Sequence, residues 1–197
     1  MSITETAHRR SIGAARNPES QEAILEAAEA ILAEMGYAGF SIEAVARRAK
    51  AGKPTIYRWW PSKAHLLLDV YKRQKDVLPE ADTGTLVGDL TGFLSNLAGF
   101  WRTPAGGVFR SVIAEAQADD KAAAALRAYS DDRIGHAAGF FDRAKARGEV
   151  GLEVDSRAAS FLLSAYAWKL LLTGQLEHAR HDIDQVVAIM ARGILKR

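Results

Sequence analysis

Cysteine is absent from this chain of 197 residues. Disulfide bonds, thiolate metal sites and cysteine nucleophiles are therefore excluded, so packing must supply the stability of the fold. Long apolar runs are absent too. No segment approaches the roughly 18 consecutive apolar residues of a membrane-spanning helix, and the N-terminus lacks the apolar centre of a signal peptide. We therefore expect a cytoplasmic protein that is neither exported nor inserted into a membrane.

Signals of catalysis are equally sparse. The sequence has no glycine-rich phosphate-binding loop and no Gly-x-Ser-x-Gly motif, and Gly106-Gly107 is interpreted as a helix break. His178 and His181 are spaced to face one metal ion, but Arg180 lies between them and no carboxylate stands at ligand spacing. We expect no enzymatic activity, no metal site and no cofactor.

Alternation of polar and apolar residues, the pattern of a half-buried strand, is missing, as are internal repeats and low-complexity tracts. Apolar residues recur instead at helical spacing. The chain is 48% hydrophobic and 25% charged, which is typical of a globular protein with a packed core. The predicted fold class is therefore all-α.

Basic residues are concentrated in one segment, although the net charge is only +2. Residues 44–75 hold nine Lys or Arg and a single acid, Asp69, whereas residues 76–197 hold fourteen basic and sixteen acidic residues. A solvated helix face normally mixes the two signs, so this imbalance indicates an anionic partner, with nucleic acid as the leading candidate. The alternative is a chance cluster of surface cations.

Three helices are predicted before and within the basic segment. Residues 1–17 show no period and are expected to form a flexible arm. A helix should run from Pro18 to just before Gly36, and a short second helix should follow Ser41, a typical N-cap residue. The turn Lys50-Ala51-Gly52 leads to a third helix that begins at Lys53-Pro54. Two short helices joined by a glycine-containing turn form a helix-turn-helix, whose second helix enters the major groove of DNA.

The third helix carries two kinds of side chain. Ile56 and Trp60, four residues apart, are predicted to be buried, so Trp60 is a core residue rather than a DNA contact. The other faces of the helix are left to meet DNA. Lys63 is placed in the first turn of a fourth helix, where free backbone N–H groups and the ammonium together favour a phosphate.

The arrangement over about residues 18–65 resembles the DNA-binding domain of the TetR (tetracycline-repressor) family of bacterial transcription regulators. The segments SIEAVARRA and Thr55-Ile56-Tyr57, with Trp59 and Ser62-Lys63, carry the resemblance. It implies that phosphates are contacted by Ser41, Tyr57, Trp59 and Lys63, and that Lys53, Pro54, Thr55 and Arg58 face the bases. Arg48, which points away from the buried face of the second helix, completes the predicted DNA-binding set.

The turn departs from the Gly-Val-Ser pattern that is usual in that family. Lysine in a left-handed conformation is strained relative to glycine, and Gly52 is a weaker cap than serine. Two arrangements remain open: Lys50 occupies a looser left-handed turn, or the left-handed residue has moved to Gly52.

A second domain is predicted beyond a linker that contains Pro79 and Gly84. Helical stripes recur over residues 86–101, 108–116, 119–147, 157–174 and 182–197, and Gly148 should stop the longest of these helices. We therefore divide the chain into a flexible arm (1–17), a three-helix helix-turn-helix DNA-binding domain (18–75) and a larger C-terminal helical ligand-binding and dimerisation domain (76–197).

The last two helices are apolar around more of their circumference than one intramolecular face needs, which predicts a four-helix bundle between two protomers. Deep burial within a monomer is the alternative. The predicted interface consists of Phe161, Leu162, Ala165, Leu172, Val186, Val187, Met190 and Ile194.

Aromatic side chains of the second domain could line an apolar pocket, although single aromatics are more often plain core. The candidates are Phe93, Trp101, Phe109, Tyr129, Phe140, Tyr166 and Trp168. They suggest a small lipophilic or aromatic effector with few charges. The resemblance implies that such a ligand moves the fourth helix and separates the recognition helices.

The predicted function is a sequence-specific DNA-binding transcription regulator, a ligand-responsive repressor that binds a palindromic operator as a homodimer. The alternatives are an architectural protein that binds double-stranded DNA without sequence preference, and an interaction protein whose C-terminal helices bind another partner.

Overall fold

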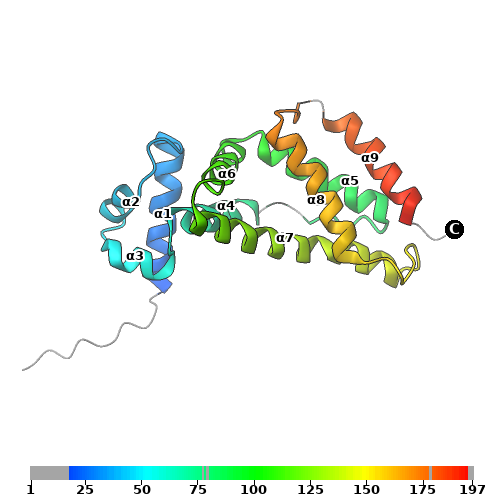
Figure 1. The fold of residues 1–197 in the computed structure, drawn as a ribbon, viewed down its shortest axis with the longest axis horizontal. Coiled ribbons are helices and arrows are strands. Elements are labelled where there is room, and N and C mark those ends of the chain that lie inside the picture. Colours follow the sequence, from blue (N-terminus) through cyan, green and yellow to red (C-terminus); the bar gives the residue numbers. More distant parts are fainter. Residues whose placement is uncertain (1–17, 77, 79, 178, 195–197) are drawn as a thin grey trace, which may run out of the picture.

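The computed structural model describes residues 18–76, 78, 80–177 and 179–194 (Figure 1). Within these residues the chain is all-α, as predicted, and the expected N-terminal arm lies outside them. No described helix is both long and apolar enough to cross a bilayer. The described residues form nine helices: α1 (Pro18–Met35), α2 (Ile42–Arg48), α3 (Lys53–Trp59), α4 (Lys63–Lys75), α5 (Leu86–Trp101), α6 (Pro104–Glu115), α7 (Asp120–Ala146), α8 (Ser156–Leu172) and α9 (Ala179–Ile194).

Helices α1 to α3 form a small cluster at one end of the molecule (Figure 1). The predicted limits of α1 are confirmed: the helix stops before Gly36, whose φ of 64° is a conformation that favours glycine. Ser41 caps α2 as predicted, because its hydroxyl oxygen accepts a hydrogen bond from Ala44 N at 3.1 Å. The end of α1 and the start of α2 were therefore correctly predicted from the sequence.

In the turn between α2 and α3 the left-handed residue is Lys50, the first of the two arrangements left open by the sequence. Lys50 has a φ of 51°, and Ala51 N donates to Ala46 O at 3.0 Å, the hydrogen bond of a Schellman motif. Gly52 is extended instead, with a φ of −72°, and occupies the N-cap of α3 without a side-chain cap bond. The left-handed residue has therefore not moved to position 52, and α3 begins at Lys53.

Helices α5 to α9 form the larger part of the molecule (Figure 1). The long helix α7 packs against α8, and α5 packs against α9. Gly148 follows α7 with a φ of 79°, which confirms it as the predicted stop. Helix α4 contacts α1 as well as α6 and α7, so it is packed against both parts of the molecule.

The predicted helix break at Gly106-Gly107 is wrong. Thr103 caps α6 and Pro104 begins it, so both glycines lie inside the helix. Gly106 is buried, and a Cβ at that position would lie 2.0 Å from the carbonyl oxygen of Trp101. The glycine therefore permits the close approach of α6 to the end of α5 rather than ending a helix.

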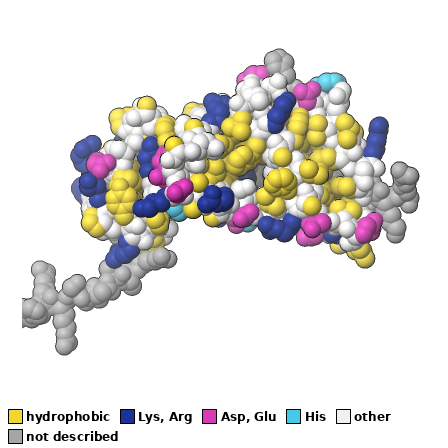
Figure 2. Space-filling model, viewed as in Figure 1, with side chains coloured by type: hydrophobic (Ala, Val, Ile, Leu, Met, Phe, Trp, Pro, Cys, Tyr) yellow, Lys and Arg dark blue, Asp and Glu magenta, His cyan; other side chains and the backbone are white. Residues whose placement is uncertain are grey.

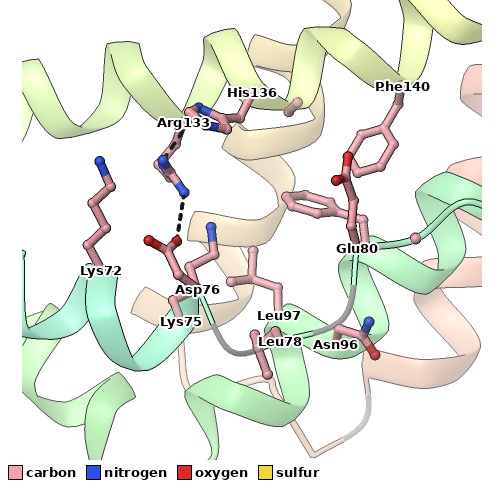
Figure 3. A pocket seen from close by; sticks show the side chains of 13 residues that line it. Lys72, Lys75, Asp76, Leu78, Glu80, Asn96, Leu97, Arg133, His136 and Phe140 are labelled. Atoms are coloured by element: carbon pink, nitrogen blue, oxygen red, sulfur yellow. Dashed lines mark hydrogen bonds and ion pairs between the residues drawn. The ribbon is translucent and has the colours of Figure 1, made fainter.

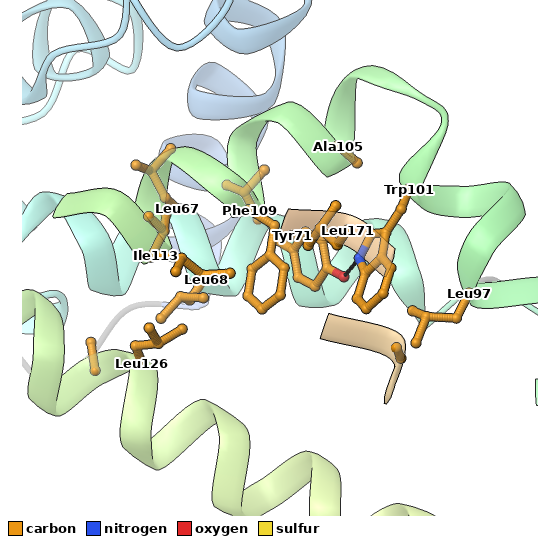
Figure 4. Close-up of a cluster of buried hydrophobic side chains, with 14 of the residues drawn as sticks. Leu67, Leu68, Tyr71, Leu97, Trp101, Ala105, Phe109, Ile113, Leu126 and Leu171 are labelled. Carbon is orange, nitrogen blue, oxygen red and sulfur yellow. Dashed lines mark hydrogen bonds between the residues drawn. The ribbon is translucent and has the colours of Figure 1, made fainter. Parts of the chain in front are cut away.

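Aromatic side chains pack where α4, α5 and α6 meet (Figure 4). Tyr71 and Phe109 are stacked, with ring centroids 4.6 Å apart, and Trp101 Nε1 donates a hydrogen bond to the Tyr71 hydroxyl at 2.6 Å. Burial raises the pKa of Tyr71 above its ordinary value of 10.0, so this hydroxyl stays neutral. The cluster fixes the middle of α4 against the larger part of the molecule.

Candidate nucleic-acid interface and ligand-sized cavity

Helix α3 separates its buried and exposed side chains as the sequence predicts. Ile56 is inaccessible and Trp60 is 2% exposed, whereas Tyr57 is 47% exposed and Arg58 is also exposed. Lys53 and Pro54 lie exposed at the start of the same helix. Figure 2 shows Lys and Arg side chains gathered over this end of the molecule.

Trp60 anchors α3 to α4 through its ring and its indole N–H. Its Nε1 donates a hydrogen bond to Asp69 Oδ2 at 2.7 Å, and its ring stacks on Trp59 with centroids 5.9 Å apart. The prediction that Trp60 is a core residue is confirmed. Asp69, the single acid of the basic segment, is therefore engaged by an indole and does not neutralise a cation there.

Two of the predicted DNA-contacting cations are held by glutamates. Arg48 donates to both carboxylate oxygens of Glu34, at 2.6 and 2.7 Å, and Lys53 Nζ lies 3.0 Å from Glu43 Oε1. Hydrogen bonds from the two cations lower the pKa of both carboxyls. These exposed pairs are weak and readily exchanged for another anion. Sequence reasoning did not anticipate either pair.

Lys63, the first residue of α4, lies between the two parts of the molecule. Its Nζ is 3.7 Å from Glu115 Oε2 and 4.0 Å from the centroid of the Tyr37 ring. The Tyr37 hydroxyl donates to the same carboxylate at 2.5 Å, and burial together with this hydrogen bond raises the tyrosine pKa. The ammonium predicted to bind phosphate is thus already paired with an acid at the end of α6.

The remaining predicted contacts, Ser41, Thr55 and Trp59, lie at the N-cap of α2 and on α3, and Ser62 precedes Lys63 at the start of α4. Ser41 keeps its hydroxyl proton free for a further acceptor while its oxygen caps α2. Thr55 and Trp59 are half-buried on α3. Ser62 occupies the N-cap position of α4, but its hydroxyl contacts His65 Nδ1 at 2.8 Å and makes no cap bond. The predicted set therefore lies on α2, α3 and the start of α4.

Helices α8 and α9 leave large apolar side chains in solvent. Phe161, Leu162 and Leu172 on α8 are 60%, 63% and 51% exposed. Ala165 is also exposed, while Val186, Met190 and Ile194 are half-buried. Figure 2 shows hydrophobic side chains gathered over these helices.

One member of the predicted interface lies elsewhere. Val187 is completely buried in the core of the chain itself, because it faces inward from α9. Ile189, an apolar residue of the same helix that the predicted interface does not include, is 68% exposed. Helix α9 carries apolar residues on both its inward and its outward face. Only its packing against the other helices shows which residue lies on which face.

Most of the aromatics predicted to line a pocket pack against one another. Trp101 and Phe109 are buried and stacked, with centroids 6.1 Å apart, and Trp168 meets Phe109 edge to face at 5.6 Å. With Phe93 and Tyr129 they surround a space of only about 30 Å³. That space is large enough for a water but too small for an effector, so these side chains serve mainly as core. Tyr166 is half-buried on α8 and lines neither this space nor the larger cavity described next.

A larger cavity of about 370 Å³ lies between α4, α5 and α7 (Figure 3). Of the predicted pocket aromatics, Phe93 and Phe140 line it. Its other lining residues are largely charged or polar, which sequence reasoning did not foresee: Lys72, Lys75, Asp76, Glu80, Asn96, Arg133 and His136. This cavity is therefore lined by charged as well as apolar side chains, and only two of the predicted aromatics take part in it.

Among residues 18–76, 78, 80–177 and 179–194, no group of three or more His, Asp or Glu is placed to hold a metal ion. His178, one of the two histidines considered for a metal, lies outside the described residues.

Sequence profiles match both parts of the chain. Residues 24–70 match the family described as bacterial regulatory proteins, tetR family, and residues 80–190 match the tetracyclin repressor-like C-terminal domain. The HTH-type transcriptional regulator YdeS of Bacillus subtilis is 33% identical over 82% of this chain and 83% of its own length. The DNA-binding transcriptional repressor TetR of Mycobacteroides abscessus is 29% identical over 90% of this chain and 97% of its own.

Solved structures agree with the profiles. The crystal structure of the TetR family transcription regulator SCO0332 superposes with a TM-score of 0.77 at 30% identity, covering 89% of this chain and 98% of that protein. Salmonella enterica GusR superposes with a TM-score of 0.65 at 24% identity, covering 90% and 96%. The second likeness concerns the fold alone.

Proposed function

Since this chain belongs to the TetR family of DNA-binding transcription regulators, we propose that it is a ligand-responsive repressor that binds a palindromic operator as a homodimer. The observation that carries the proposal is the placement of α4. Its first residue, Lys63, adjoins the predicted DNA-binding surface, and its last turn, with Lys72 and Lys75, lines the 370 Å³ cavity. One helix thus connects a DNA-binding end to a cavity of ligand size.

The exposed apolar side chains of α8 and α9 support a homodimer. Large apolar side chains that are exposed together on one face mark interaction sites. A two-fold four-helix bundle would cover this face on both protomers. Such a dimer presents two α3 helices to half-sites about 34–36 Å apart, or a multiple of that distance. The operator is therefore expected to be a palindrome.

Ligand response is proposed to proceed through α4. A ligand in the cavity would contact the last turn of α4, while Tyr71 and Asp69 tie the middle of the helix to α5 and α3. Because a packed helix moves as a unit, a shift at its end repositions α3 and Lys63. A ligand that prefers the shifted state then lowers the affinity for DNA by its differential affinity for the two states.

Replacement of Arg58 with alanine should relax the base preference of the protein. Arg58 is exposed on α3, and loss of a bidentate contact to guanine costs about 1–3 kcal/mol at one position of the site. The measurement is a comparison of binding to the operator and to its single-base variants. Arg110→Ala, an exposed arginine of α6, is the matched control. An equal loss on every sequence would assign Arg58 to the backbone instead.

Replacement of Lys63 with alanine should weaken binding to all DNA sequences alike. One lost phosphate contact reduces the magnitude of the slope of log K against log salt by about 1. In the free protein Lys63 pairs with Glu115, and it must leave this carboxylate to bind a phosphate. The substitution therefore also removes the ion pair between α4 and α6. The slope is measured by titration at several salt concentrations, with Lys121→Ala on α7 as the control. A slope equal to that of the unmodified protein would remove Lys63 from the DNA interface.

A further inference from the structure

The cavity between α4, α5 and α7 has two kinds of wall. Phe93 and Leu97 of α5 and Phe140 of α7 supply apolar surface, whereas Lys75 of α4 and Arg133 of α7 supply positive charge (Figure 3). A purely lipophilic molecule would cover the charged side chains of this wall without replacing the water that solvates them. The walls therefore select a molecule that has both an apolar and a charged portion.

The acids around the cavity are already committed to other cations. Arg133 lies 3.6 Å from Asp76, and Arg143 lies 3.2 Å from Glu80. Asp132, beside the cavity on α7, pairs with Arg133 at 2.6 Å and with Lys72 at 3.6 Å. The negative charges that face this region are thus compensated.

Lys75 has no such partner. None of the carboxylates in the described parts of the chain lies within ion-pairing distance of its ammonium, and its Nζ is 5.9 Å from the Phe93 ring centroid. Burial, and next the charge of Arg133, lower its pKa to about 8, against weaker opposition from Asp76 and Asp132. A partly buried, uncompensated ammonium is the strongest attraction that the cavity offers to an anion.

We infer that this cavity binds a small amphipathic carboxylate, whose acid group pairs with Lys75 and whose apolar body contacts Phe93, Leu97 and Phe140. One uncompensated cation matches one negative charge, and a volume of about 370 Å³ falls in the range of small-molecule sites. The inference narrows the expected effector with few charges to a monoanion. Its regulatory consequence, though not the binding itself, rests on the proposed function.

The test compares decanoate with decanol, which have the same chain length and differ in charge. Isothermal titration of the full-length protein at pH 7 should show that decanoate binds at least about tenfold more tightly than decanol. This factor corresponds to the usual contribution of a charge-assisted hydrogen bond to binding. Lys75→Met should remove most of that difference, and Lys75→Arg should retain it because the charge is kept. Lys121→Met, an exposed lysine of α7 outside the cavity, is the matched control.

The pH dependence gives a second readout. Lys75 carries its charge below its pKa of about 8 and loses it above, and a bound anion moves that pKa upward. The charged and titratable groups that face Lys75 are Lys72, Asp76, Glu80, Asp132, Arg133 and His136, and the comparison with uncharged decanol separates a loss of charge on the protein from any general effect of pH. Decanoate binding should therefore weaken as pH rises past 8, whereas decanol binding should not.

Three outcomes overturn the inference: equal affinity for decanoate and decanol, undiminished decanoate binding by Lys75→Met, or no binding of benzoate, hexanoate or decanoate at about 1 mM. Failure of the proposed function has a different signature. If decanoate binds through Lys75 but leaves the affinity for DNA unchanged, the carboxylate site stands and the ligand-responsive mechanism through α4 is rejected.

Discussion

Replacement of Trp60 with alanine is expected to lower the free energy of unfolding of the α1–α4 unit by about 3–5 kcal/mol. The side chain is buried between α3 and α4, so its removal leaves a cavity and takes away the hydrogen bond to Asp69. Helix α3 has only seven residues and cannot hold its position by itself. Loss of DNA binding should accompany the loss of stability.

Urea unfolding followed by circular dichroism measures this effect. Trp59→Ala is the matched control, because that ring is half-buried beside Trp60 and should cost less stability. Trp60→Phe keeps most of the buried ring and should lie between the two. Equal losses for Trp59→Ala and Trp60→Ala would show that Trp60 is not the anchor of α3.

Replacement of Leu162 with aspartate should dissociate the proposed homodimer. A carboxylate at the centre of an apolar interface is buried without a partner, at a cost of about 3–5 kcal/mol, and the two-fold symmetry places it on both protomers. The dissociation constant of the dimer should therefore rise by at least about 100-fold. Binding to a palindromic operator should fall with it, because a monomer contacts one half-site.

Sedimentation equilibrium over a concentration series measures the association. Leu152→Asp is the matched control, because Leu152 is 83% exposed in the turn before α8 and lies outside the α8 and α9 face. An unmodified protein that sediments as a monomer at micromolar concentration would remove the homodimer, and an unaffected Leu162→Asp dimer would place its interface elsewhere.

Local signals in the sequence sufficed for most helix ends. Ser41 as an N-cap, Pro54 in the first turn of α3 and Gly148 after α7 each have a backbone reason that needs no tertiary information. The burial of Ile56 and Trp60 followed from their spacing along one helix face. The all-α fold and the arrangement of α1 to α4 were accessible for the same reason.

Features that depend on packing between distant segments were not accessible. Gly106 suggested a break, yet its lack of a side chain serves the approach of α6 to Trp101. Val187 and Ile189 look alike in the sequence, and only the position of α5 decides which of them is buried. Local periodicity carries no information on such choices.

Electrostatic pairs were hidden for the same reason. The partners of Arg48 and Lys63 are Glu34 on α1 and Glu115 on α6, far from them along the chain. The uncompensated charge of Lys75 emerges only when the acids around it are assigned to Arg133 and Arg143. A count of charges identified the basic segment but not which cations are available to DNA or to a ligand.

Selection of DNA from a random-duplex library by the purified protein, at moderate salt and followed by sequencing, tests the central claim most directly. We predict an enriched palindrome whose half-sites are centred about 34–36 Å apart or a multiple of that distance, the signature of a sequence-specific dimer. Retention that depends on salt but enriches no sequence would contradict the account, since phosphate contacts alone give such binding, and would identify an architectural DNA-binding protein.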